Sequence, residues 1–70
     1  MVEVYVFKTS VEQKDLDQLE MILNSILPYS RWNFDLEDCD NILRIESEID
    51  ISKITCSRLN AEGYLCEELE

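Results

Sequence analysis

The sequence contains no histidine, one glycine, one proline and three cysteines, and these shortages exclude several kinds of site. Without histidine, the chain lacks the side chain that most often acts as a general base near neutral pH. With a single glycine it cannot form a glycine-rich phosphate-binding loop, and the pattern G-x-x-x-x-G-K is absent. No serine or cysteine lies beside a plausible base. We therefore predict that the protein is not an enzyme and carries no cofactor.

The three cysteines, Cys39, Cys56 and Cys66, are an odd number and contain no C-x-x-C pair. A disulfide framework uses an even set, and a structural zinc site uses four ligands with locally paired spacing. We therefore expect free thiols in a reducing cytoplasm. Cys56 and Cys66 remain candidates for a pair that is close in space.

Basic residues are also scarce, since six lysines and arginines face sixteen acidic residues and the net charge is −10. This charge repels phosphate backbones and anionic lipids, so we expect neither a nucleic-acid nor a membrane partner. No apolar run approaches the roughly 20 residues of a membrane span, and no signal-peptide pattern opens the chain. We expect one soluble, cytoplasmic domain over residues 1–70 whose partner is a protein, either a basic protein or a second copy.

The first half of the chain predicts a strand followed by a helix. Residues 2–8 alternate with period two and are rich in valine and aromatic side chains, which is typical of a strand. The stretch 9–13 offers two capping boxes, one starting at Thr9 and one at Ser10, so a helix should begin there. Apolar residues then recur at helical spacing until Pro28, which should end the helix within the three preceding residues.

The second half predicts a hairpin followed by a second helix. Residues 31–37 and 41–48 alternate on either side of the polar turn D-C-D-N, which indicates an antiparallel hairpin. Asp50 or Ser52 should cap the second helix. Gly63 follows that helix where a positive φ is needed to end it.

A short strand over residues 64–69 closes the chain and completes the order β-α-β-β-α-β. This order predicts an α+β ferredoxin-like sandwich, in which both helices cover one face of a four-stranded antiparallel sheet. Right-handed crossovers place the first and third strands in the centre and the other two at the edges.

The sheet face away from the helices is a candidate binding surface. We expect Tyr5 and Phe7 of the first strand to lie on this face, together with Asn33 and Arg44. RNA-binding sandwiches stack bases on aromatic residues of their central strands, but the third strand here has no aromatic residue and the net charge opposes phosphate binding. These four residues are therefore candidates for a small ligand or a protein partner.

The sequence resembles the heavy-metal-associated domain family, which includes copper chaperones and the N-terminal modules of copper-transporting ATPases. V-Y-V (4–6) leads into a capped helix, and W-N-F-D-L (32–36) stands where the family has V-x-V-D-L. I-L-R-I (42–45) takes the place of the third strand, and E-G-Y (62–64) ends the second helix where the family repeatedly has G-Y. The resemblance covers nearly the whole chain and implies the same sandwich.

The resemblance also implies a G-M-x-C-x-x-C motif at the first strand-to-helix junction, where two thiolates bind Cu(I) or another soft ion. The matching positions are Val11 and Lys14, or Glu12 and Asp15 with a shift of one residue, and none is cysteine. Lys14 places a positive charge where the family has a metal-binding cysteine. Tyr64 matches a tyrosine that lies near the metal loop in the family. The resemblance therefore implies the scaffold of the family without its metal site.

Taken together, these features predict a non-enzymatic interaction or regulatory module with a heavy-metal-associated-like fold. Two alternatives stay open. One is a metal-binding protein with a relocated site that uses Cys39, Cys56 or Cys66, which requires two sulfurs within reach of a shared ion. The other is a sandwich that binds a small ligand on its open sheet face.

Overall fold

The computed structural model of the chain describes residues 1–28, 30–35 and 41–69. The helices and strands follow the predicted order, with a short 3-10 turn, η1, before the first helix. The elements are β1 (Glu3–Thr9), η1 (Gln13–Asp15), α1 (Leu16–Ile26), β2 (Arg31–Asp35), β3 (Ile42–Ser47), α2 (Ser52–Ala61) and β4 (Cys66–Leu69). No helix in these residues is long and apolar enough to cross a membrane.

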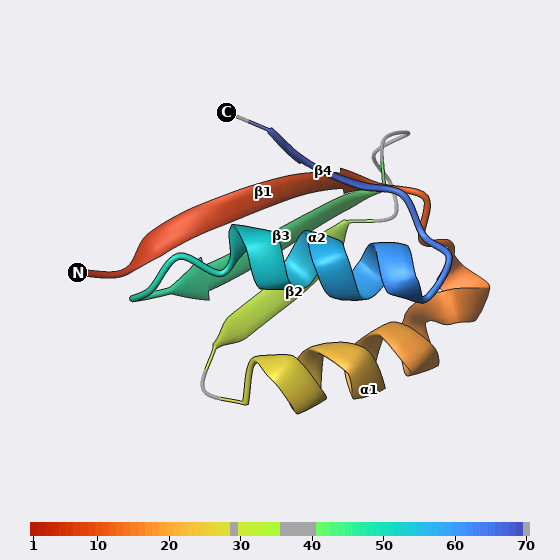
Figure 1. Cartoon of the computed structure of the whole chain (residues 1–70), viewed down its shortest axis with the longest axis horizontal. Coiled ribbons are helices and arrows are strands. Elements are labelled where there is room, and N and C mark those ends of the chain that lie inside the picture. Colours follow the sequence, from red (N-terminus) through yellow and green to blue (C-terminus); the bar gives the residue numbers. More distant parts are fainter. Residues whose placement is uncertain (29, 36–40, 70) are drawn as a thin grey trace.

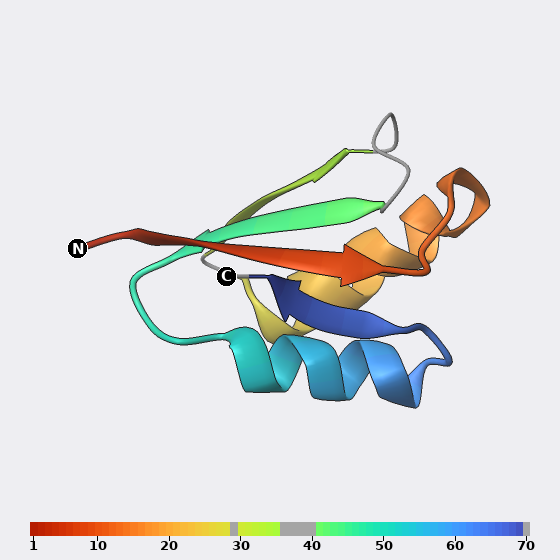
Figure 2. The ribbon, with the colours of Figure 1, turned by 90° about the horizontal axis from the view of Figure 1, so that it is seen from above.

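The four strands form one antiparallel sheet in the order β2-β3-β1-β4, which confirms that the first and third strands are central. Helices α1 and α2 run in opposite directions on the same side of this sheet (Figure 1). Figure 2 shows the strands in the same order from top to bottom. The predicted α+β sandwich is therefore confirmed.

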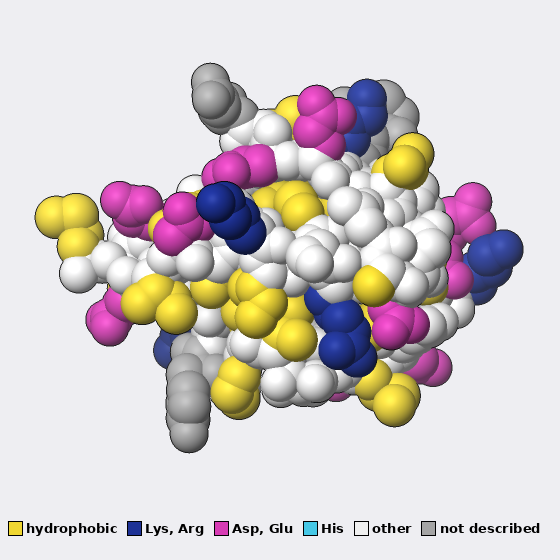
Figure 3. Space-filling view, viewed as in Figure 1, with side chains coloured by type: hydrophobic (Ala, Val, Ile, Leu, Met, Phe, Trp, Pro, Cys, Tyr) yellow, Lys and Arg dark blue, Asp and Glu magenta, His cyan; other side chains and the backbone are white. Residues whose placement is uncertain are grey.

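The hydrophobic core lies between the sheet and the two helices. Phe7 of β1 pairs directly with Leu43 of β3, and neither side chain has exposed surface. Both helices contribute fully buried leucines to the same cluster, namely Leu19, Leu23 and Leu59. On the outer surface, hydrophobic side chains gather where the end of α1 approaches the start of α2 (left centre of Figure 3).

The prediction that Tyr5 and Phe7 face away from the helices is wrong. Phe7 is fully buried in the core and Tyr5 packs against it, whereas Val4 is 57% exposed on the opposite face. Both alternating sets of β1 are largely apolar, so the period alone does not identify the inward face. The larger aromatic side chains bury more apolar area, and they therefore take the side covered by the helices. Asn33 and Arg44 pair directly on the outer face.

The predicted start of the first helix is also displaced. β1 continues through Thr9, and neither Thr9 nor Ser10 caps a helix. The chain needs several residues to turn from the end of β1 towards the helical layer, and the helical turn begins with η1 after Glu12. The sequence therefore correctly predicted a capping box at the start of the helical segment, but placed it two or three residues too early.

The two hydroxyl groups connect distant segments instead. The Thr9 hydroxyl donates to the carbonyl oxygen of Asn41 at 2.9 Å and accepts the N–H of Val11 at 3.2 Å. Oγ of Ser10 accepts the N–H of Leu65 at 2.8 Å, and the N–H of Ser10 donates to the carbonyl oxygen of Leu65 at 3.1 Å. These bonds fix the corner after β1 to the start of β3 and to the segment before β4.

The other helix boundaries agree with the sequence. Helix α1 ends at Ile26, inside the interval predicted before Pro28. Oδ1 of Asp50 accepts both the N–H of Ser52 at 2.9 Å and its hydroxyl at 2.6 Å, so Asp50 satisfies the N–H of the first residue of α2, although the N-cap position itself is Ile51. Gly63 has a φ of +94° after the end of α2, as predicted.

The strands are shorter than the alternation indicated. β3 lies within the predicted range 41–48, and residues 36–37 of the predicted second strand lie outside the described residues. β4 begins at Cys66 because Tyr64 still belongs to the turn after α2, where its N–H donates to the carbonyl oxygen of Leu59 at 2.9 Å.

Because one face of β1 is buried and the other is exposed, substitutions on the two faces should differ in their effect on stability. Replacing Phe7 with alanine should lower the free energy of unfolding by about 3–5 kcal/mol, because it leaves a cavity in the core. Replacing the exposed Val4 with alanine should change it by less than about 1 kcal/mol. Urea unfolding at low protein concentration measures both values, and a larger loss for Val4 would contradict the assigned orientation.

A buried hydroxyl on α2 predicts a stabilising substitution. Thr55 has no exposed surface, and its Oγ1 has no hydrogen-bond partner among the described residues. Replacing Thr55 with valine keeps the shape and removes the unpaired polar atom, so the free energy of unfolding should rise by about 1–2 kcal/mol. Thr55→Ser, which keeps the hydroxyl and removes the methyl group, should destabilise the protein in the same urea assay.

Candidate functional site

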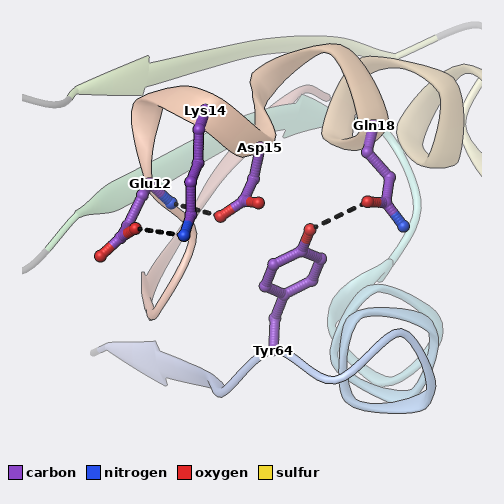
Figure 4. A network of polar contacts seen from close by, with 5 residues as sticks. All are labelled: Glu12, Lys14, Asp15, Gln18 and Tyr64. Atoms are coloured by element: carbon purple, nitrogen blue, oxygen red, sulfur yellow. Dashed lines mark hydrogen bonds and ion pairs between the residues drawn. The ribbon is translucent and has the colours of Figure 1, made fainter.

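The junction between β1 and α1, where the family resemblance implies a metal site, is closed by contacts among its own residues (Figure 4). The N–H of Glu12 donates to Oδ2 of Asp15 at 3.1 Å, and the N–H of Asp15 donates to the carbonyl oxygen of Glu12 at 2.9 Å. Nζ of Lys14 lies 3.4 Å from Oε2 of Glu12. Val11 has no exposed surface and belongs to the core. These four positions turn the chain into the helix and fill the core, and none supplies a thiolate.

Tyr64 connects the turn after α2 to the first helix. Its hydroxyl donates to Oε1 of Gln18 at 3.2 Å, as Figure 4 shows, and Nε2 of Gln18 donates to Oε2 of Glu62 at 3.2 Å. Desolvation raises the pKa of Tyr64, and the negative charge of Asp15 raises it further. The hydroxyl therefore remains protonated and continues to donate this hydrogen bond near neutral pH.

Two of the three cysteines come together in the fold. Sγ of Cys56 on α2 and Sγ of Cys66 at the start of β4 are 3.2 Å apart, and both thiols are free. Both side chains are half-buried and pack against the core. Burial raises the pKa of the Cys66 thiol far above its ordinary value, and the hydrogen bond and charge of Cys56 raise it further. Cys39 lies outside the described residues.

The cysteine pair meets the first requirement of a relocated metal site, because two sulfurs lie within reach of a shared ion. A structural zinc site needs four ligands, however, and this pair supplies two. Within residues 1–28, 30–35 and 41–69, no group of three or more histidine, cysteine, aspartate or glutamate side chains could hold a metal ion. The described residues therefore provide an isolated dithiol.

The outer face of the sheet, opposite both helices, contains a shallow hollow of about 430 Å³. Of the four residues predicted for a site on this face, Asn33 and Arg44 line the hollow, whereas Tyr5 and Phe7 lie on the other side of the sheet. The hollow is lined by Val4, Arg31, Trp32, Asn33, Arg44 and Glu46. Its volume falls within the range of roughly 300–1,000 Å³ that is usual for small-ligand sites.

A larger groove of about 720 Å³ lies at one end of the sandwich, between the C-terminal end of α1 and the segment that precedes α2. Its apolar wall consists of Val2, Ile26, Leu27, Pro28, Ile49 and Ile51, and Arg31, Glu46 and Glu48 contribute charge. Sequence reasoning did not identify this groove because its residues come from separate segments. The one local signal is Ile49, an isoleucine that is 70% exposed between a strand and a helix.

No family model matches the chain, and no curated protein or solved structure matches it. The heavy-metal-associated resemblance therefore remains a hypothesis that rests on the order of elements and on the motifs in the sequence.

The raised pKa of Cys66 predicts a pH dependence of stability for the reduced protein. The ordinary thiol pKa is 9.0 and the folded value is higher, so the folded state holds this proton more tightly than the unfolded state. The resulting stabilisation is complete below about pH 8 and decreases as pH rises above 9. Urea unfolding with a reducing agent should therefore give a steeper loss of stability between about pH 8 and pH 10 for the native sequence than for Cys66→Ala. Parallel profiles for the two proteins would contradict this.

Proposed function

We propose that the chain is a non-enzymatic interaction module with a heavy-metal-associated-like fold and no metal at the first junction, and that it forms a homodimer through the outer face of its sheet. The observation that carries this proposal is the uncovered face itself. Both helices lie on the other side, and Val4 is 57% exposed. Pairing this face with a second copy removes the apolar surface of Val4 from water.

The distribution of charge favours a second copy as the occupant of this face. The strand registers place three basic and three acidic side chains on it: Lys8, Arg31, Arg44, Asp35, Glu46 and Glu67. The whole chain carries a net charge of −10, so two copies repel one another over most approaches. Contact through a face whose charges balance minimises this repulsion. In a dimer with two-fold symmetry, basic side chains of one copy can then face acidic side chains of the same patch on the other copy.

A specific interface would take up only a modest share of the surface of the molecule. A standard interface buries about 800 Å² on each partner, which is roughly a sixth of the 4922 Å² of accessible surface. The shallow hollow beside Val4 and Trp32 can receive side chains of the second copy. An apolar centre with a charged surround is the usual composition of such an interface.

The contacts that occupy the junction support a role in interaction. Val11 is buried, and the side chains of Glu12, Lys14 and Asp15 interact with the junction itself. Dimerisation through the balanced face leaves the acidic side chains of η1 and α1 at the surface, where they suit a basic protein partner. The free thiols of Cys56 and Cys66 favour the cytoplasm as its location.

Changing one exposed valine tests the dimer. The native sequence should sediment at twice its monomer mass of 8.3 kDa, and Val4→Glu should sediment as a monomer because it adds two like charges to the centre of the interface. Met21→Glu is the matched control, since Met21 is 73% exposed on α1, away from the proposed interface, and this variant should remain dimeric. Equilibrium sedimentation over a range of concentrations measures all three masses.

Two outcomes overturn the proposed dimer. The first is a native protein that remains a monomer at the highest concentration reached. The second is a native dimer that Met21→Glu dissociates while Val4→Glu leaves it intact, which would move the interface to the helical side.

A further inference from the structure

The sulfur atoms of Cys56 and Cys66 are held together by the turn that joins their two elements. The N–H of Tyr64 donates to the carbonyl oxygen of Leu59 at 2.9 Å, and Gly63 supplies the positive φ that lets the chain reverse. This turn directs β4 back along α2. The 3.2 Å separation of the sulfurs is therefore a consequence of ordered backbone on both sides of the pair.

A second set of bonds fixes the position of Cys66. Ser10 and Leu65 exchange two hydrogen bonds, at 2.8 and 3.1 Å, immediately before β4. Cys66 then pairs with Thr9 at the end of β1. Because the backbone of Cys66 is anchored to the end of the central strand β1, its thiol is held close to that of Cys56, and reaction between the two sulfurs has a high effective concentration.

We propose that Cys56 and Cys66 form a reversible modification site, a dithiol that a low-molecular-weight disulfide such as oxidised glutathione converts into an intrachain disulfide. The bond requires an S–S distance of about 2.0 Å, so the two sulfurs need to approach by little more than 1 Å. It requires no further ligand, whereas a tetrahedral metal site requires two more than this pair supplies. The proposal is independent of dimerisation through the outer sheet face.

The reaction consists of two exchange steps. The Cys56 thiol loses its proton, and its sulfur attacks one sulfur of the small disulfide, which forms a mixed disulfide and releases one thiolate. The Cys66 thiol then loses its proton and attacks Sγ of Cys56, which forms the intrachain bond and releases the second thiolate. The two released thiolates take up the two protons. The protein loses two electrons and two protons, and one small disulfide takes them up to become two small thiols.

Oxidation ties β4 covalently to α2. β4 is an edge strand with four described residues that pair with β1, so few ladder bonds hold it in place when it opens. A bond between Cys56 and Cys66 constrains that opening. The redox state of the pair thus sets how readily the C-terminal edge of the sheet separates from the remainder of the domain.

The test uses the full chain carrying Cys39→Ser, in which Cys56 and Cys66 are the only thiols. The protein is equilibrated with mixtures of reduced and oxidised glutathione, quenched with an alkylating agent and weighed by mass spectrometry. Both alkylation sites should disappear together with a loss of two hydrogens. The ratio of disulfide to dithiol should rise tenfold for each tenfold rise in the ratio of oxidised glutathione to the square of reduced glutathione. Hydrogen exchange of β4 amides should become slower on oxidation, whereas that of β2 amides should not change.

The single variants Cys56→Ser and Cys66→Ser in the same background provide the matched controls. Each should stop at a glutathione adduct or stay reduced, and neither should show slower exchange in β4. Four results overturn the proposal. Three of them are two alkylated thiols in the most oxidising mixture, a final state with glutathione attached, and disulfide-linked dimers as the main product. The fourth is a protein that forms no intrachain disulfide but in which one equivalent of Cu(I) protects both thiols from alkylation in competition with a strong chelator. That result would assign the pair to metal binding.

Discussion

The burial of one face of the β1–β3 pair beneath both helices organises the whole domain. Phe7 and Leu43 occupy the centre of that face, and Leu19 and Leu59 cover them from α1 and α2. A 70-residue chain has a small core, so the apolar sides of both helices are needed on the same side of the sheet. The opposite face is then left without a helical cover, and Val4 remains exposed on it.

The corner after β1 is held by hydrogen bonds from short polar side chains. Thr9 connects it to Asn41, Ser10 connects it to Leu65, and Asp15 closes the turn into α1. These bonds satisfy backbone groups that a sharp corner would otherwise leave unpaired. They also fix the segment that precedes β4, and through it they position a thiol that lies far from the corner in the sequence. The same hydrogen bonds therefore hold the junction in place and bring the two cysteines close together.

The charged side chains are distributed unevenly over the surface, and the composition of the chain does not show this. The net charge of −10 suggests a uniformly acidic protein, yet the outer sheet face carries equal numbers of acidic and basic side chains. Lys8, Arg31 and Arg44 come from three different strands, and only the antiparallel registers bring them together. The proposed dimer uses this balanced face. The proposed dithiol lies between α2 and β4 on the helical side, so the two proposals concern separate parts of the molecule.

The order of the elements, the central position of the first and third strands, the helix end before Pro28 and the turn at Gly63 could all be predicted from the sequence. These features follow from local periodicity, from the φ restrictions of proline and glycine, and from the handedness of crossovers. The sequence also showed that the junction contains no thiolate. The buried face of β1 could not be predicted in this way, because both alternating sets are apolar and the packing of the helices selects one of them. Only the tertiary structure likewise decided that Cys56 and Cys66 meet, since the distance between residues on a helix and a strand depends on how the turn between them packs, and residue spacing does not record that packing.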